Sequence, residues 1–181
     1  MITSCVIRPV IVSRANLCGK PSKLEDSLSE AVQLVESLPL VLVKNSSVVR
    51  LRKPCPGRLF GKGNLDFFRK MFLKEKITLV IVDGNLTAIQ QRNLEREWNV
   101  KVLDRTGLIL EIFGSRAMSR EGVLQVELAH LNYQKSRLVR SWTHLERQRG
   151  GMGFLGGPGE TQIESDKRAI NARISQIKKS L

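Results

Sequence analysis

The chain has 181 residues, of which 41% are hydrophobic and 26% charged, a composition that excludes disordered and collagen-like proteins and fits a globular one. Thirty Lys and Arg residues against 17 Asp and Glu give a net charge of +13, which favours a polyanionic partner, with nucleic acid ahead of a membrane surface. No apolar run approaches the ~20 residues of a membrane span, and the cysteines and histidines lack the spacing of a zinc site.

The N-terminal residues leave the compartment open between two alternatives. We expect Cys5, Cys18 and Cys55 to be reduced thiols, which indicates a cytoplasmic protein. The first 24 residues carry four cations and no acid, as an organellar transit peptide does, so an organellar matrix remains the alternative. Residues 6–12 nevertheless make a better first strand than a presequence, and Pro9 predicts that this strand lies at a sheet edge.

Strand and helix patterns alternate up to about residue 118. Strands are predicted at 6–12, 40–43, 47–51, 77–82 and 100–103, with Asn45 and Ser46 as a turn, and helices at 22–38, 65–75 and 87–98. The continuous apolar run 77–82 is typical of a strand covered on both faces, and Thr87 is expected to cap the helix that follows it. The alternation predicts a small α/β domain with a mostly parallel sheet at residues 1–118.

The hydrophobic period changes from residue 119 onward. Leucines and Trp142 repeat with spacings of four and three up to Leu145, and isoleucines continue a matching stripe from Ile163 to Leu181. Lys135 and Lys167 interrupt the two stripes, and we expect them to extend along the edge of an open seam. Residues 119–181 are therefore predicted to form a long antiparallel α-helical hairpin, a coiled-coil arm about 40 Å long.

A glycine-rich loop, residues 150–159, separates the two predicted arm helices. Six of its ten residues are glycine, which leaves backbone N–H groups open to close approach. Arginines precede the loop and an apolar pair lies at its tip, a combination that suits folded RNA with exposed bases. The candidate RNA-binding residues are Arg140, Arg147, Arg149, Gly150, Gly151, Gly153, Phe154, Leu155, Gly157 and Gly159.

A second glycine motif, PGRLFGKG at residues 56–63, is similar to a phosphate-binding loop but departs from its pattern. That pattern requires glycine and Ser or Thr where Pro56 and Gly63 stand. The loop precedes a predicted helix and can still hold an anion at the helix N-terminus, which makes Gly57, Gly61, Lys62 and Gly63 a weak candidate nucleotide site. We find no residue set typical of a catalytic or metal site.

Four long motifs resemble those of the HflX-type GTPases: VLDRTGLILEIF at 102–113, EGxLQVELA at 121–129, RLxRxWxHLERQ at 137–148, and GGxG with GPGETQ at 150–162. The resemblance implies a small α/β domain, a helical hairpin with a glycine-rich tip, and a GTPase domain after it. It also implies binding to the rRNA of the large ribosomal subunit, splitting of stalled or stressed ribosomes, and a hairpin tip near the peptidyl transferase centre.

In that family the phosphate loop of the GTPase domain would begin shortly after Leu181. GTP and Mg²⁺ are therefore expected in a domain that this chain lacks, and the resemblance implies ribosome docking without GTP turnover. Two alternatives remain open: an ATP-binding domain that remodels RNA, and a regulatory domain that packs on the GTPase domain in cis. We expect a monomer, with an arm-swapped dimer as the alternative.

Overall fold

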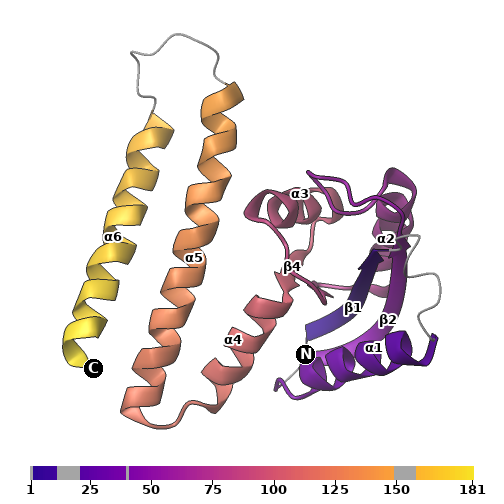
Figure 1. Ribbon diagram of the computed structural model, residues 1–181, viewed down its shortest axis with the longest axis horizontal. Coiled ribbons are helices and arrows are strands. Elements are labelled where there is room, and N and C mark those ends of the chain that lie inside the picture. The colour runs from indigo at the N-terminus through magenta and orange to yellow at the C-terminus, as the bar shows by residue number, and fades with distance from the viewer. Residues whose placement is uncertain (1, 12–20, 40, 149–157) are drawn as a thin grey trace. The chain divides into compact units, whose positions relative to one another are not determined.

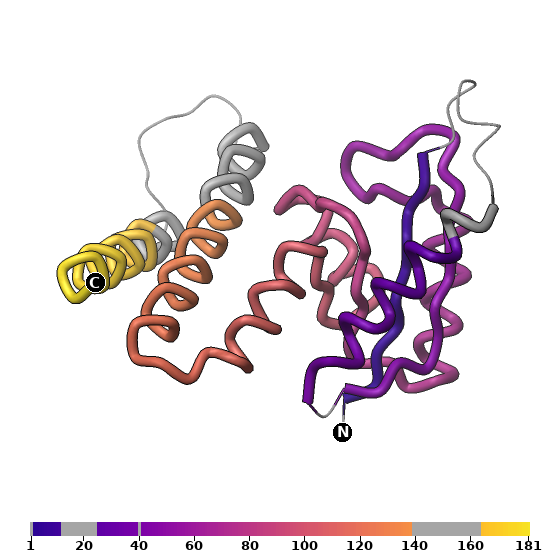
Figure 2. Tube along the Cα trace, turned by 60° about the horizontal axis from the view of Figure 1, so that its bottom comes forward, coloured from indigo at the N-terminus to yellow at the C-terminus, as the bar shows by residue number. Residues whose placement is uncertain are grey.

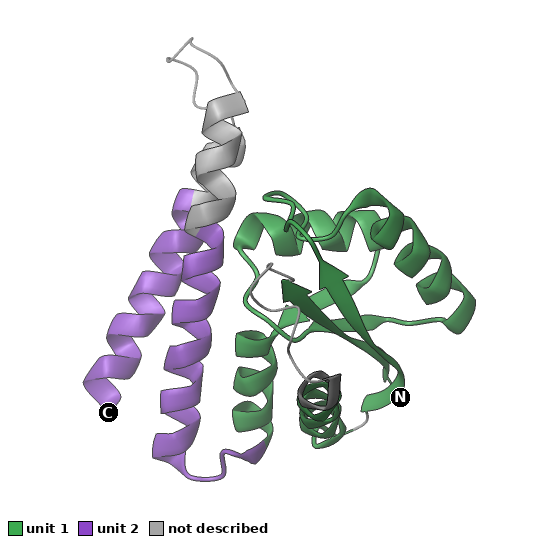
Figure 3. Ribbon diagram, turned by 45° about the vertical axis from the view of Figure 1, so that its right-hand side comes forward, with its two compact units in different colours: residues 1–115 green, residues 116–181 purple. Residues whose placement is uncertain are grey.

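The computed structural model describes residues 2–11, 21–39, 41–148 and 158–181, and the side chains of 2–11, 25–39, 41–138 and 164–181. The chain divides into two compact units, Met1–Ser115 and Arg116–Leu181 (Figures 1 and 3), which are described separately below.

Unit 1 is an α/β domain built on a four-stranded parallel sheet with the strand order β2-β1-β3-β4. The strands are β1 (Ile2–Ile11), β2 (Val41–Leu51), β3 (Leu79–Val82) and β4 (Lys101–Asp104). The helices are α1 (Pro21–Glu36), α2 (Lys62–Glu75), α3 (Ala88–Trp98) and α4 (Arg105–Arg116). The predicted α/β class and parallel sheet are thus confirmed.

Helices cover both faces of this sheet and produce two separate cores. One face of the strands packs against α2, α3 and the loop between β2 and α2. The other face packs against α1 and α4, as the arrangement in Figure 3 shows. All four residues of β3 are buried, as the continuous apolar run predicted, because alternate side chains enter opposite cores.

An aromatic cluster fixes α2 and α3 to each other. The Trp98 ring lies 5.2 Å from that of Phe72, 6.0 Å from Phe68 and 5.8 Å from Phe60, measured between ring centroids. The indole Nε1 donates a hydrogen bond to the carbonyl oxygen of Leu65 at 3.2 Å. Edge-on and tilted contacts of this kind stabilise a core beyond the area they bury, so α2 has a well-defined inner face.

The predicted turn at Asn45 and Ser46 is wrong, because β2 is one continuous strand. It pairs with β1 from Val41 to Leu51, and the register shifts by one residue where Ser4 pairs with Val43 and Cys5 with Asn45. A β-bulge therefore lies where a hairpin turn was expected. Polar residues alone do not distinguish the two, since both interrupt the apolar alternation.

The predicted edge position of the first strand is also wrong, because β1 lies between β2 and β3. The proline signal has a local explanation, however. Strand β3 pairs with β1 only from Ser4 to Ile7, so Pro9 has a neighbouring strand on the β2 side alone. A proline lacks the backbone donor, and this position tolerates that loss.

The sequence predicted helix α3 but not helix α4. Thr87 caps α3 as expected, with a reciprocal capping box to Gln90. Helix α4 was not predicted, and its N-terminus is instead fixed by Asp104, whose carboxylate accepts a hydrogen bond from the Gly107 N–H at 2.9 Å.

Unit 2 consists of α5 (Arg120–Gln148) and α6 (Pro158–Ser180), whose described parts lie side by side in Figures 1 and 2. Ile174 and Ile177 of the predicted isoleucine stripe are buried, whereas Lys167 is exposed. Arg173 pairs with Glu127, which brings the last part of α6 beside the first part of α5.

Candidate functional site

The loop between β2 and α2 is held by its own backbone and by buried side chains. Cys55 and Leu59 exchange backbone hydrogen bonds of 2.9 and 2.8 Å, and Leu59 adopts a positive φ of 62°. The side chains of Leu59 and Phe60 are buried in the core that also contains α2 and α3. The loop therefore has a defined conformation in this structure, which comes from the protein's own contacts.

The predicted nucleotide-binding residues lie together on this loop and on the start of α2. The carbonyl oxygen of Gly57 accepts a hydrogen bond from Asn93 Nδ2 at 2.8 Å, so that part of the loop is tied to α3. Gly61 is the N-cap of α2 and supplies no side-chain cap, while Lys62 and Gly63 follow in the first turn and are exposed. The arrangement leaves the helix N-terminus open, and nucleotide binding here stays a prediction.

A network of charged side chains occupies the carboxyl ends of the strands. The Asp83 carboxylate, which follows β3 and is 3% exposed, accepts hydrogen bonds from Arg8 of β1 and from Arg105 of α4, the latter at 2.9 Å. Arg105 also donates to Glu30 of α1 at 2.7 Å. These hydrogen bonds raise the pKa of the Arg105 guanidinium, with the bond to Glu30 as the largest cause. Ion pairs thus join β1, β3, α1 and α4.

This network lies where doubly wound sheets usually bind ligands, at the carboxyl ends of the strands beside the point where the strand order reverses. Here that point lies between β1 and β3. The buried Asp83 is already bonded to two guanidinium groups, so the network holds the structure together rather than presenting open groups. The sequence patterns did not reveal it, because Arg8, Asp83 and Arg105 come together only through the strand order.

The two described cysteines differ in their surroundings. Cys5 is buried in the sheet, and burial raises the pKa of its thiol to about 12, with the nearby Glu75 charge adding to the effect. Cys55 is exposed. Both are free thiols, and Cys18 lies outside the described residues.

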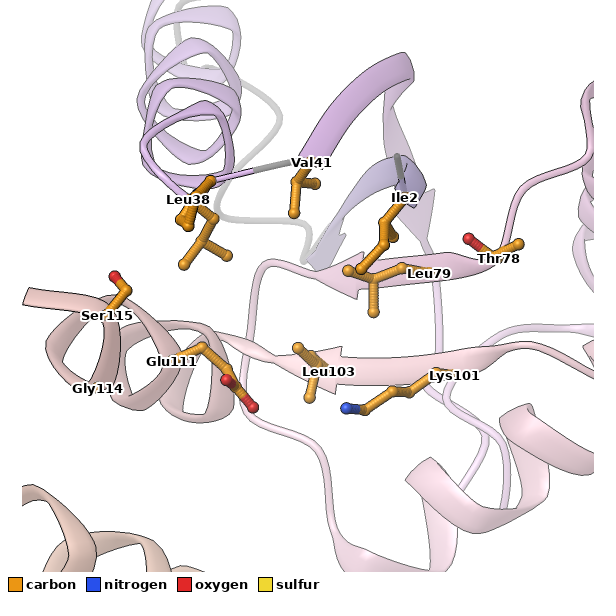
Figure 4. A pocket seen from close by; sticks show the side chains of 11 residues that line it. Ile2, Leu38, Val41, Thr78, Leu79, Lys101, Leu103, Glu111, Gly114 and Ser115 are labelled. Atoms are coloured by element: carbon orange, nitrogen blue, oxygen red, sulfur yellow. The ribbon is translucent and has the colours of Figure 1, made fainter.

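A hollow of about 520 Å³ lies at the opposite edge of the sheet, at the amino ends of the strands (Figure 4). Ile2, Val41, Leu79 and Leu103 supply apolar walls, and the second half of α4 closes one side. Lys101 and Glu111 are its charged side chains. The lining is mostly apolar and has few convergent polar groups, so it does not indicate a particular ligand.

Arg173 and Arg137 each contact another side chain within unit 2. Arg173 donates two hydrogen bonds to the Glu127 carboxylate, at 2.7 and 3.0 Å, and this pairing lowers the pKa of Glu127. The Arg137 guanidinium lies over the Tyr133 ring, 4.5 Å from its centroid.

The side chains of the predicted RNA-binding residues fall outside what the structure describes, although the backbones of Arg140 and Arg147 belong to α5 and that of Gly159 to α6. The residues between α5 and α6 are not described, and no side chain is described from 139 to 163. This covers all ten candidates, which are Arg140, Arg147, Arg149, Gly150, Gly151, Gly153, Phe154, Leu155, Gly157 and Gly159. Among the described residues, no group of three or more His, Cys, Asp or Glu could hold a metal ion, and no helix has the length and apolarity to cross a membrane.

Comparison with known proteins gives consistent matches along the chain. Residues 25–114 match the family described as GTP-binding GTPase N-terminal, and residues 116–181 match the GTP-binding GTPase Middle Region. The chain is 53% identical to the GTPase HflX of Magnetococcus marinus over 85% of its own length, and 48% identical to that of Escherichia coli over 72%. It spans 35% and 30% of the lengths of these two relatives.

Solved structures share the fold. The complex of SsGBP with GDP matches all of this chain and 43% of its own, with a TM-score of 0.68 at 22% identity. A GTP-binding protein of Sulfolobus solfataricus in complex with GDP matches 98% of this chain and 46% of its own, with a TM-score of 0.59 and again 22% identity. At this identity the likeness supports the fold alone.

Proposed function

Because this chain belongs to the HflX family of GTPases, of which it matches the N-terminal and middle regions, we propose that it is a ribosome-docking region that binds RNA of the large ribosomal subunit. In this proposal α5 and α6 form an antiparallel coiled-coil arm whose glycine-rich tip enters a functional cleft near the peptidyl transferase centre, and docking supports ribosome splitting.

The observation that carries the proposal is the division of α6 into two faces. Ile174 and Ile177 are buried on one face, while Arg168 and Lys179 are exposed on the opposite face. An amphipathic helix with cations on its open face is suited to lie along a phosphate backbone. The ion pair between Glu127 and Arg173 holds that helix against α5, so the cations are presented from an ordered surface.

Within the arm, the residues at the tip have distinct proposed roles. Arg140, Arg147 and Arg149 would neutralise phosphates, and Phe154 and Leu155 would pack against bases. The glycines from 150 to 159 would let RNA approach the backbone closely. The GTPase domain of the longer relatives would then supply GTP turnover.

Sedimentation with purified large ribosomal subunits across a salt series tests this proposal. We expect salt-sensitive co-sedimentation that is lost when residues 150–159 are replaced by a short linker. Replacing Arg147 and Arg149 with alanine should flatten the dependence of log K on log salt by about 1.4 to 1.8, since each phosphate contact contributes ~0.7 to ~0.9.

Unchanged affinity and unchanged salt slope in the double arginine variant would show that the tip footprint is wrong. Absence of binding at low salt would favour the alternative in which this region regulates the GTPase domain in cis. That alternative predicts altered GTP hydrolysis when the chain is added to a separate HflX GTPase domain. The ATP-binding alternative predicts saturable binding in calorimetry that Lys62→Ala abolishes.

A further inference from the structure

The positive charge of the chain is concentrated in a part of unit 1 that lies far along the sequence from the arm. Residues 44–76 contain ten Lys or Arg and only two acids, Asp66 and Glu75, which gives this segment +8 of the net charge of +13. The segment comprises most of β2, the loop after it and the whole of α2. These cations lie outside the proposed arm, so RNA binding by the arm does not account for them.

Strand β2 and helix α2 lie next to each other, and this brings cations of the two elements together. Strand β2 is an edge strand, and Lys44 Nζ donates a hydrogen bond to the carbonyl oxygen of Glu75 at the end of α2. Asn45 of β2 bonds to the Glu75 carboxylate as well. The exposed side of α2 is therefore continuous with the sheet edge. We call this region the α2 surface, and its exposed cations are Lys44, Lys62, Arg69, Lys70, Lys74 and Lys76.

Within the part of the chain that the structure describes, the cations of α2 form no ion pair with a carboxylate. The ion pairs seen in unit 1 include those of Arg8, Arg58 and Arg105, but not one of Lys62, Arg69, Lys70 or Lys74 among the described side chains. Glu75, one of the two acids of the segment, is already bonded to Asn45. Unpaired surface cations without a structural task provide an electrostatic footprint for an anionic partner.

An exposed aromatic ring lies among these cations. Phe67 of α2 is 62% exposed, and the edge of its ring contacts Phe68 in the core, with centroids 5.5 Å apart and planes at 71°. The contact with Phe68 positions the Phe67 ring, while most of the ring is exposed to solvent. A flat aromatic surface beside lysines is the combination on which unpaired nucleic-acid bases stack.

The order of residues around α2 favours RNA over a membrane surface as the partner. Successive residues turn by about 100°, so Lys70 and Lys74 lie between Phe67 and the exposed Leu73 on the outer side of α2. The two apolar side chains therefore form no continuous stripe, and inserting both into a bilayer would carry two ammonium groups with them. Folded RNA, with phosphates beside splayed bases, matches the same order directly.

We propose that the α2 surface is a second RNA-binding site, in which Lys70 and Lys74 contact phosphates and Phe67 stacks on an unpaired base. The site consists of residues other than those proposed at the arm tip. It rests on the proposed function only for the identity of the RNA as ribosomal.

Binding of a fluorescein-labelled RNA hairpin with a single-stranded loop, followed by anisotropy across a salt series, tests this site. The protein is the full chain with residues 150–159 replaced by a short linker, so that the proposed tip does not contribute. Lys70→Gln with Lys74→Gln should reduce the salt slope by about 1.4 to 1.8. Phe67→Ala should weaken binding by about fivefold or more, the effect of losing one stacked base.

Matched variants serve as controls. Lys101→Gln with Arg116→Gln removes two exposed cations from β4 and the end of α4 and should leave the salt slope unchanged. Leu73→Ala truncates the other exposed apolar side chain of α2 and should leave RNA affinity unchanged. Circular dichroism of every variant confirms that the fold is retained.

Equal loss of binding in the α2 and control pairs would overturn the proposal, because charge alone would then explain the affinity. Binding to vesicles of phosphatidylserine and phosphatidylcholine, without binding to the hairpin, would overturn it in favour of a membrane. These results are independent of the ribosome experiment: hairpin binding through α2 without co-sedimentation of the intact chain would refute only the ribosomal function.

Discussion

Replacing Asp83 with asparagine should destabilise unit 1, because this side chain is 3% exposed and accepts hydrogen bonds from both Arg8 and Arg105. Two charge-assisted bonds at about 1.5 to 3 kcal/mol each set an upper range of about 3 to 6 kcal/mol. The two arginine side chains are 25% and 35% exposed, so water takes over part of their solvation when the carboxylate is lost. We therefore expect a loss of about 2 kcal/mol in the free energy of unfolding.

Urea denaturation followed by tryptophan fluorescence measures this loss. Trp98 lies in the core of unit 1, and Trp142→Phe in all proteins removes the other tryptophan, so the signal reports on unit 1. With a slope of about 2 to 3 kcal/mol/M, the midpoint should fall by about 1 M.

The matched control is Glu97→Gln, which removes the half-buried partner of the exposed Arg58 at 3.4 Å and should change the free energy of unfolding by less than about 0.5 kcal/mol. If Asp83→Asn shifted the midpoint no more than Glu97→Gln does, the network would not be a structural element of the domain. The carboxyl edge would then be free to serve as a ligand site.

Three further predictions follow from the described residues. Because the pKa of Cys5 is raised in the folded protein, its thiol stays neutral there at a pH at which the unfolded chain ionises it. The free energy of unfolding should therefore fall as pH rises from about 9 towards about 12. Cys5→Ala should flatten this dependence in urea titrations at a series of pH values. Because the pKa of Glu127 is lowered, its ion pair contributes to stability at neutral pH, and this contribution is lost as pH falls through that pKa. Carbon-detected NMR should show a higher pKa for Glu127 in Arg173→Gln. An unchanged pKa would contradict the ion pair. Lys76 ends α2 with a φ of 53°, so Lys76→Gly should raise the free energy of unfolding by about 1 kcal/mol, whereas Lys76→Ala should give no such gain.

The sequence was most informative where a single element determines its own pattern. The buried run of β3 and the cap at Thr87 are local properties, and both are confirmed. The turn expected at Asn45 proved to be a bulge, since the difference depends on which strand lies opposite. Helix α4 was missed although Asp104 provides its N-terminal cap, because a short apolar segment does not by itself distinguish a helix from a strand.

Sites built from several elements could not be predicted from the sequence patterns. Arg8, Asp83 and Arg105 are separated by 75 and 22 residues, and their meeting follows from the order of the strands. The α2 surface likewise depends on two elements, because β2 and α2 meet through the hydrogen bonds of Lys44 and Asn45 to Glu75.

The central place of β1 has a consequence for how the chain is made. This strand is synthesised before both of its neighbours, since β2 and β3 are complete only after Leu51 and Val82 have been synthesised. A nascent chain that has not reached β3 carries a two-stranded pair in which the side of β1 facing Val80 and Ile81 is still open. Pausing of translation before residue 79 would therefore leave the centre of the future sheet exposed, a state that favours aggregation.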